Sequence, residues 1–492
     1  MNIALLSHEW LVVALGLGVL LADLWLPAAA RPKLGYAAAV GVGVILLYSL
    51  LAVSAPAQTQ YACAGLYAMD GLALFFKRFF LLAALVVLLM SVEFADRIEA
   101  GIAEFYALIL FALAGMLFAS SANNFALLFV SLELITVTFY VLTSFQRARL
   151  ASLEAGVKYL IIGALSTGCT VFGIALVYGI SRQLDFNALS AVAAQYSGNH
   201  IFLFGLLLIL AGLGFKITAF PFQIWAPDVY QGAPAPTTAF LAIGSKAAGF
   251  VLLLRVLFIA VPDVTAQWWK LLLTLSAITI LYGNLCAIPQ RNVKRLLGYS
   301  SVAHAGYMLL GVAAMAAALA TRGAEAHAGG SAILYYLSGY LFTLLGAFTV
   351  ICLVMRQVEG EDVSALAGLN QRSPLLAATM TLAMVSLAGV PPLAGFFGKF
   401  LLFKAALAQG ATQPAYYWLV GLAIAGAVIS LYYYFGVIRA IFWARGAVDA
   451  SPIRLSGPIQ ASLYGCVAGM FVLGVFPAWL VNLASEAVKV LR

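Results

Sequence analysis

The chain has 492 residues, of which 64% are hydrophobic and only 9% are charged, and its mean hydropathy is +1.04. Because about a quarter of an average soluble chain is charged, this composition excludes a soluble globular protein. The net charge of +8 does not indicate nucleic acid as a partner, since polytopic membrane proteins carry an excess of Lys and Arg in their cytoplasmic loops.

The first apolar run, at residues 9–27, lies where a secretory signal peptide would lie. A signal peptide carries its positive charges before its apolar core, whereas here Arg31 and Lys33 follow the core. We therefore expect a retained first transmembrane helix whose amino terminus lies outside the cytoplasm.

Apolar segments continue from one end of the chain to the other. A spanning helix needs about 20 mostly apolar residues, so the sequence predicts an all-α polytopic membrane protein with about 14 transmembrane helices. The predicted spans are residues 9–27, 35–55, 70–93, 104–120, 124–143, 154–180, 201–224, 236–260, 268–288, 293–319, 331–355, 375–408, 415–443 and 458–482.

Basic residues are distributed unequally over the loops between these spans. The loops on one side carry Arg31, Lys33, Arg97, Arg147, Arg149, Arg291, Lys294, Arg295, Arg356, Arg372, Arg439, Arg445 and Arg454. The loops on the other side carry only Arg182, Lys270, Arg322, Lys489 and Arg492. The richer side is expected to be cytoplasmic, and an even number of spans then places both termini outside.

Two of the predicted spans combine glycine, proline and a lysine within an apolar stretch. The seventh span contains Pro221, and the twelfth contains Pro391 and Pro392; proline removes a helix hydrogen bond and breaks or kinks the helix. Interrupted spans at corresponding places in two halves are typical of inverted repeats with sites at the breaks. Two unrelated kinks are the alternative, but Lys216 and Lys399 stand beside the breaks and favour a repeat.

Four ionisable residues stand where a bilayer is driest, namely Glu133, Lys216, Lys246 and Lys399. A charge at the centre of a spanning helix costs roughly 2.5–3.5 kcal/mol on insertion scales, so such residues usually mark a proton or ion path. Glu133 and Lys216 can pair across the bundle, and a static salt bridge is the alternative. Lys246 and Lys399 have no obvious acidic partner, and burial disfavours their charged form, so each can take up and release a proton.

Other ionisable residues allow two interpretations. His304 lies near the middle of the tenth span, where imidazole can pass a proton between its ring nitrogens, although a lone helical histidine is more often a packing residue. Lys158 follows Glu154 at the i+4 position, the favourable order for a helix ion pair, so a relay role and an interfacial salt bridge are equally supported. Lys77 and Arg255 lie nearer the span ends and are expected to reach the membrane surface.

No motif indicates soluble catalysis or a bound cofactor. The sequence lacks a G-x-G-x-x-G that opens a helix after a strand, a Walker-type lysine and a G-x-S-x-G. Its five cysteines show no C-x-x-C or Cys/His spacing. We therefore expect no metal and no cofactor on this chain, and an ion gradient or a partner protein as its energy source.

These residues closely resemble the antiporter-like subunits of respiratory complex I, the proton-pumping NADH:quinone oxidoreductase, over nearly the whole chain. The strongest passages are SLELITVTFYVLTSFQR, EAGVKYLIIGALSTG, FKITAFPFQIWAPDVYQGAPAPTTAFLAIGSKAAG, RNVKRLLGYSSVAHAGYMLLG and PPLAGFFGKF. The family pattern of a glutamate in span five, lysines in spans seven and eight and an ionisable residue in span twelve is matched at Glu133, Lys216, Lys246 and Lys399. The run DVYQGAP favours the subunit N branch over its paralogues.

The resemblance implies one membrane domain over residues 1–492. It implies amino-terminal helices in residues 1–103, two inverted five-helix repeats at 104–260 and 268–443, and a carboxy-terminal helix in 458–492. The residues expected to carry protons are Glu133, Lys158, Lys216, Lys246, His304 and Lys399, with helix breaks at Pro221, Pro391 and Pro392.

The resemblance also implies that this chain performs no redox chemistry. FMN, iron–sulfur clusters and quinone would belong to the complex as a whole, and quinone reduction elsewhere would supply the energy. The expected partners are other membrane subunits, including antiporter-like paralogues, together with the lipid bilayer and protons, and the expected location is a bacterial inner membrane.

Two other functions fit part of the sequence. A subunit of a multisubunit cation/proton antiporter shares the implied fold, and fold alone does not determine function. A membrane scaffold without its own proton path fits the packing but leaves the four buried charges unexplained.

Overall fold

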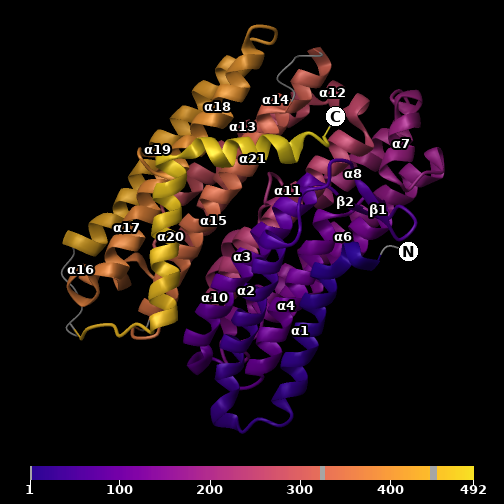
Figure 1. Cartoon of the computed structure of the whole chain (residues 1–492). Helices are drawn as coiled ribbons and strands as arrows, with labels where there is room; N and C mark the ends of the chain where they lie inside the picture. Colours follow the sequence, from indigo (N-terminus) through magenta and orange to yellow (C-terminus); the bar gives the residue numbers. More distant parts are fainter. Residues whose placement is uncertain (1–2, 322–326, 359, 444–450, 492) are drawn as a thin grey trace.

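The computed structural model describes residues 3–321, 327–358, 360–443 and 451–491. Arg322, Arg445 and Arg492, three of the loop charges counted above, lie outside these ranges. The described chain is a bundle of helices with a single two-stranded hairpin (Figure 1). The lipid core offers no hydrogen-bond partners to backbone groups, so helices, which satisfy these groups internally, are the expected solution.

Three long helices and the hairpin form the amino-terminal part. Its elements are η1 (Ile3–Leu6), α1 (Ser7–Asp23), η2 (Ala28–Lys33), α2 (Leu34–Leu51), β1 (Gln60–Ala62), β2 (Tyr67–Met69), α3 (Gly71–Glu93) and η3 (Ala95–Arg97). The strands are antiparallel, with Tyr61 opposite Ala68. Asp70 follows the hairpin and starts α3 as its N-cap, because its side chain accepts a hydrogen bond of 2.7 Å from the backbone N–H of Ala73.

The next part covers the first predicted repeat. Its elements are α4 (Ile102–Ser120), α5 (Phe125–Thr143), α6 (Leu150–Ser181), α7 (Phe186–Ala193), η4 (Ala194–Tyr196), α8 (His200–Ile217), α9 (Trp225–Gly232), α10 (Ala235–Phe240), η5 (Leu241–Ser245), α11 (Lys246–Arg255) and η6 (Val256–Ala260). The segments η5 and η6 are π-helical. The seventh predicted span ends sooner than expected, at Ile217, because Thr218 adopts a φ of +62° and Pro221 follows before α9 begins.

The remaining part covers the second predicted repeat and the carboxy-terminal end. Its elements are α12 (Pro262–Gln267), α13 (Trp269–Ala287), α14 (Val293–Thr321), α15 (Ala328–Met355), η7 (Val363–Leu366), α16 (Leu369–Arg372), α17 (Pro374–Ala388), α18 (Ala394–Gly410), α19 (Ala415–Trp443), α20 (Gly457–Val475) and α21 (Pro477–Val488). The twelfth predicted span is two helices, α17 and α18, with Gly389, Pro391 and Pro392 between them.

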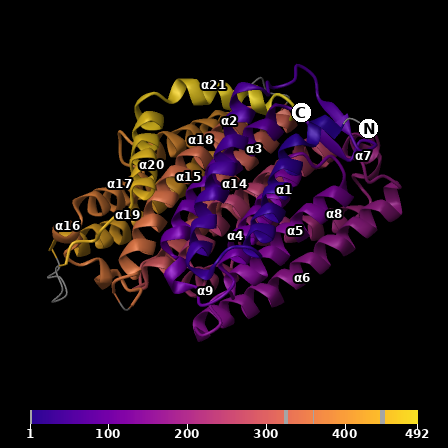
Figure 2. The same cartoon turned by 60° about the horizontal axis from the view of Figure 1, so that its bottom comes forward.

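The last predicted span, at 458–482, is longer than the helix in the structure. Helix α20 ends at Val475 and Pro477 opens a separate helix, α21, because a proline cannot continue the hydrogen-bond ladder of the preceding helix. Helix α21 lies across the ends of the other helices (Figure 1) and packs against α3, where a side chain at Gly71 would lie 3.3 Å from the Cα of Ala487. Both termini are at this same end of the bundle (Figures 1 and 2).

Thirteen helices of the described chain are long and apolar enough to cross a membrane. The difference from the prediction arises at the twelfth span, because α17 and α18 are each too short to cross alone. The helices differ in how much of their length is buried. In Ala235–Ala260, 100% of an apolar 18-residue stretch is buried, whereas in Leu150–Ser181, which lies at the edge of the bundle in Figure 2, the share is 22%. Lys246 and His304 therefore lie on central helices, shielded from lipid by the other helices.

Candidate functional site

Glu133 and Lys216 line one small cavity between α5, α6 and α8. The half-buried Glu133 carboxylate accepts a hydrogen bond of 2.7 Å from the hydroxyl of Thr167. The hydroxyls of Ser166 and Thr170 line the same cavity. The volume open to the centre of a water molecule is about 10 Å³, close to the minimum for a single water.

Lys216 lies in the last turn of α8 and is only 4% exposed. Its Nζ donates to the hydroxyl of Tyr159 at 3.4 Å and lies 5.8 Å from the centroid of that ring. Within the described residues no ion pair joins Lys216 to Glu133. The two groups thus share a polar cavity without a direct salt bridge, which leaves the lysine free of a fixed anionic partner.

Lys246 lies where the π-helical segment η5 passes into α11. Its Nζ donates to the backbone carbonyl of Ser301 at 2.6 Å and also contacts the Ser301 hydroxyl. That hydroxyl lies 3.1 Å from the hydroxyl of Tyr230. The helices of Lys216 and Lys246 touch at Gly249, where a Cβ would lie 3.0 Å from the Cβ of Lys216.

His304 occupies the middle of the buried helix α14, and a tyrosine hydroxyl lies at each of its ring nitrogens. Nδ1 is within hydrogen-bond distance of the Tyr336 hydroxyl, and Nε2 is 3.0 Å from the Tyr434 hydroxyl. The Tyr434 hydroxyl in turn contacts the hydroxyl of Ser300. An imidazole with a hydroxyl on both nitrogens can accept a proton on one side and give one up on the other.

Lys399 on α18 points back to the end of α17. Its Nζ donates to the carbonyls of Leu387 at 2.9 Å and Ala388 at 3.0 Å, and it lies 5.1 Å from the centroid of the Tyr307 ring. The last carbonyls of a helix have no partner inside the helix and carry its partial negative charge. The break at Gly389 therefore creates a cation site in which no carboxylate of the described residues takes part.

Lys158 differs from the other predicted residues because it is 40% exposed and paired with two acids. Its Nζ lies 2.7 Å from Glu154 and 2.7 Å from Asp228. Asp228 also contacts Arg295. The structure thus places Lys158 in a network of ion pairs, away from the cavity of Glu133 and Lys216, and the sequence signal for this was the i to i+4 spacing.

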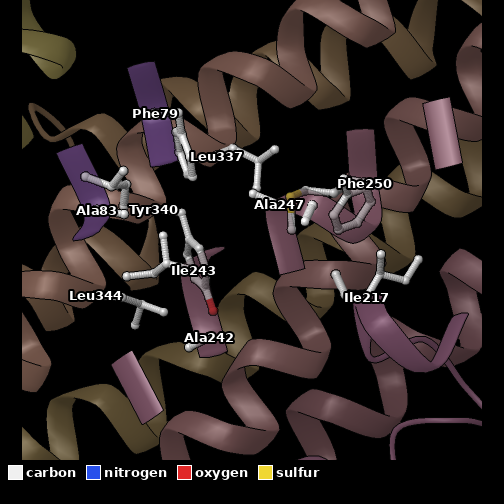
Figure 3. Packing of buried hydrophobic residues seen from close by; sticks show 14 of the residues in the cluster. Phe79, Ala83, Ile217, Ala242, Ile243, Ala247, Phe250, Leu337, Tyr340 and Leu344 are labelled. Atoms are coloured by element: carbon white, nitrogen blue, oxygen red, sulfur yellow. The ribbon is translucent and has the colours of Figure 1, made fainter. Parts of the chain in front are cut away.

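The apolar residues next to Lys216 and Lys246 in the sequence belong to the buried core. Ile217 and Phe250 pack near Ala247, and Ile243 packs against Tyr340 (Figure 3). Proton transfer needs hydrogen-bond reach or a bridging water. Lys216 and Lys246 share no hydrogen-bond partner in the described part of the chain, so a proton that passes between them requires water to enter this packing.

Two buried ion pairs were missed because Lys77 and Arg255 were expected to reach the membrane surface. Both side chains are 0% exposed. Lys77 pairs with Glu9 at 2.6 Å, and Arg255 pairs with Asp70 at 2.8 Å. The prediction that these two side chains reach the membrane surface was wrong. Their acidic partners lie far away in the sequence, on helix α1 and directly after the hairpin.

Metal ligands are not clustered: no group of three or more His, Cys, Asp or Glu that could hold a metal ion occurs among the described residues. The cysteines are all free. The groups around the central lysines are hydroxyls, backbone carbonyls, one imidazole and the Glu133 carboxylate, all of which can hold or pass a proton.

Comparison with known proteins identifies the family. A family model described as "NADH:quinone oxidoreductase/Mrp antiporter, TM" matches residues 122–430. The NADH-quinone oxidoreductase subunit N of Moorella thermoacetica is 37% identical over 486 residues, which cover 99% of this chain and 98% of that protein. The chain belongs to the NADH-quinone oxidoreductase subunit N family. It is therefore a multi-pass membrane protein of the antiporter-like class.

Two solved structures are similar to this chain over nearly its whole length. A chain of respiratory complex I from Thermus thermophilus is 31% identical, with a TM-score of 0.77 over 97% of this chain and 99% of that one. A chain of the Mrp complex from a Dietzia species has a TM-score of 0.81 at 19% identity and covers 100% of this chain and 98% of that one. The second likeness shows a shared fold only.

Proposed function

We propose that this chain is a proton-translocating membrane subunit of NADH:quinone oxidoreductase. Protons pass through Glu133, Lys216, Lys246, His304 and Lys399, and quinone reduction elsewhere in the complex supplies the energy. The chain itself does no redox chemistry; FMN, iron–sulfur clusters and quinone belong to the other parts of the complex. Other membrane subunits, including antiporter-like paralogues, pack beside it.

The observation that carries the proposal is the way in which the three central lysines are held. Each is at most 4% exposed, and each donates to hydroxyl or carbonyl oxygens. A carboxylate fixed against a buried lysine would stabilise its charge permanently, whereas neutral acceptors allow both the ammonium and the amine. Such groups can load and unload protons.

Orientation follows from the charges of the loops. We place the loops that contain Arg97, Arg149 and Arg291 in the cytoplasm of a bacterium and both termini in the periplasm, because Lys and Arg accumulate on the cytoplasmic side. The common position of the two termini at one end of the bundle supports this assignment. We also propose that residues 104–260 and 268–443 are inverted repeats, supported by one proline-interrupted helix in each.

The cation/proton antiporter remains the second candidate, favoured by the fold likeness to the Mrp complex. The higher identity to the complex I chain, 31% against 19%, and the subunit N relatives argue for the oxidoreductase. Genes for iron–sulfur and flavin subunits beside this one would support complex I, and genes for small membrane subunits alone would support the antiporter.

Lys216→Ala tests the proposal in the assembled complex. We expect the complex to assemble, but proton pumping and coupled quinone reduction to fall sharply, because a titratable group at the helix break is lost. Glu133→Ala is expected to be as harmful, and Glu133→Asp milder because the carboxylate survives with a shorter reach. The measurement is the number of protons pumped per electron, and a normal ratio in purified Lys216→Ala would contradict the proposal.

A further inference from the structure

A second polar cavity opens at the arginine-rich end of the molecule, between the two predicted repeats. It has an open volume of about 400 Å³, far more than one water needs. The side chains of Arg97, Arg149, Asn292, Lys294 and Glu361 line it. This cavity lies on the side we assign to the cytoplasm, and Lys294 of the buried helix α14 is among the residues that line it.

Lys294 lies at the inner wall of this cavity. It is 1% exposed, and its Nζ lies 2.9 Å from Glu361 on the cavity side. On the inner side the same Nζ donates to the carbonyl of Ala233 at 3.0 Å. Ala233 is the residue at which the chain passes from α9 to α10, so Lys294 touches both the polar opening and a helix break.

Glu361 holds two cations with one oxygen. Its Oε1 lies 2.9 Å from Lys294 and 2.5 Å from Nη2 of Arg149, while Asn292 donates to Oε2 at 3.3 Å. Arg149 is 41% exposed and belongs to the loop before α6. The same carboxylate oxygen thus serves both cations, and a carboxylate that turned towards Arg149 would leave Lys294 without its anion.

Helix α14 connects this end of the molecule with the central lysines. Lys294 and Ser301 are two turns apart on the same face of α14, about 10 Å along its axis. Ser301 is the residue to which Lys246 donates, and its hydroxyl contacts Tyr230 on α9. A proton released by Lys294 therefore needs a few waters along α14 to reach Lys246.

We propose that Lys294 is the cytoplasmic loading site of the proton path and that Glu361 is its switchable counter-ion. A hydronium ion in the cavity gives a proton to the Lys294 amine and becomes water. The resulting ammonium later gives that proton to a water on the Ala233 side, when Glu361 has turned to Arg149. Glu361 stays anionic throughout, and one proton enters for each one passed on. The inference rests on the proposed function and its orientation.

The charges around Glu361 agree with this role. Burial alone would raise the pKa of Glu361, but the ammonium of Lys294 and the guanidinium of Arg149 outweigh it and hold that pKa below its usual value. The other ionisable groups near Lys294 are Arg97, which lines the cavity, and Cys352 from α15. Arg295, the next residue on α14, pairs with Asp228 instead.

Two variants of the intact complex test the loading site. Lys294→Arg keeps the charge and the pairing with Glu361 but cannot release a proton, so we expect assembled complex with pumping several-fold lower. Glu361→Gln keeps one acceptor oxygen for Arg149 but removes the anion, and its NH2 group cannot accept from Asn292. Lys294 then loads less readily, so coupled turnover should fall more at alkaline pH than at acidic pH, where protons are abundant.

Glu93→Gln is the matched control. Glu93 pairs with Arg356 at 2.6 Å and is 11% exposed, against 12% for Glu361, but it does not line the cavity. Two outcomes would contradict the loading site. One is an equal loss of coupled turnover at every pH in Glu361→Gln and Glu93→Gln, and the other is normal pumping in Lys294→Arg. Either would mean that Lys294, Glu361 and Arg149 only hold the two repeats together. If Lys216→Ala also pumps normally, the proposed function fails; if only Lys294→Arg does, the loading site alone fails.

Discussion

At the scale of single residues, substitutions of Lys246 can distinguish a proton carrier from a fixed cation. Its contacts are a carbonyl and a hydroxyl of Ser301, and arginine could donate to both. Arginine cannot lose its proton inside a protein, so Lys246→Arg should freeze this group in the charged form. We expect a large loss of coupled quinone reduction and of pumping while the complex still assembles.

The matched substitution is Lys246→Met, which removes the charge and keeps a long flexible side chain. A fixed cation would tolerate arginine and reject methionine, whereas a carrier rejects both. Native turnover in Lys246→Arg, measured on purified complex with intact subunit composition, would favour the structural role.

At the scale of elements, the break between α17 and α18 positions Lys399. Gly389 has a φ of +86°, and a Cβ there would lie 2.9 Å from the Cδ of Lys399. Gly389→Ala should therefore push the lysine off the carbonyls of Leu387 and Ala388 and add a backbone strain of about 1–2 kcal/mol. We expect lower proton pumping, together with a modest loss of thermal stability.

Gly65→Ala separates the two effects of that substitution. Gly65 has a φ of +87°, and its Cβ would meet only Asp185 at an ordinary 3.5 Å. Both variants should lose similar stability in thermal unfolding, and only Gly389→Ala should lose pumping. Equal activity in the two variants would show that the position of Lys399 does not matter.

The breaks in the two helices could be predicted from the sequence, because their cause lies in the broken segments themselves. Pro221 and the pair Pro391–Pro392 act on their own helices, so their effect can be inferred without knowing what lies beside them. The acceptors of Lys399 belong to the same segment, but they depend on the angle between α17 and α18, which no spacing encodes. The hydroxyls around His304 come from α15 and α19, and only the folded chain brings them together.

At the scale of the whole molecule, one buried ion pair joins two of the amino-terminal helices to each other, and a second joins them to the rest of the fold. Glu9 on α1 pairs with Lys77 on α3, and the hydroxyl of Tyr67 contacts both. Asp70 pairs with Arg255, which lies 185 residues later at the end of α11. From their positions in the sequence, Lys77 and Arg255 were expected to reach the membrane surface. A single sequence carries no information about such distant partners.

The pair of Asp70 and Arg255 yields a prediction about assembly. Both Asp70 oxygens accept from Arg255, at 2.8 and 2.9 Å, and Arg255 also donates to the carbonyl of Ser120 at 2.8 Å. Asp70→Asn keeps the N-cap of α3, since asparagine caps as well as aspartate, but it removes the charge and replaces one of the two oxygens that accept from Arg255 with an NH2 group. The arginine is then buried without its counter-ion, at a cost of roughly 3–5 kcal/mol.

We therefore expect Asp70→Asn to lower the amount of assembled complex in the membrane and its melting temperature, with proton-to-electron ratios unchanged in what remains. The double variant with Arg255→Gln should recover part of the loss, because removing both charges leaves no uncompensated ion. Glu486→Gln, which breaks the exposed pair with Lys489, should change nothing measurable. If Asp70→Asn assembled normally but pumped poorly, the pair would belong to the proton path and not to the framework that holds α3 against α11.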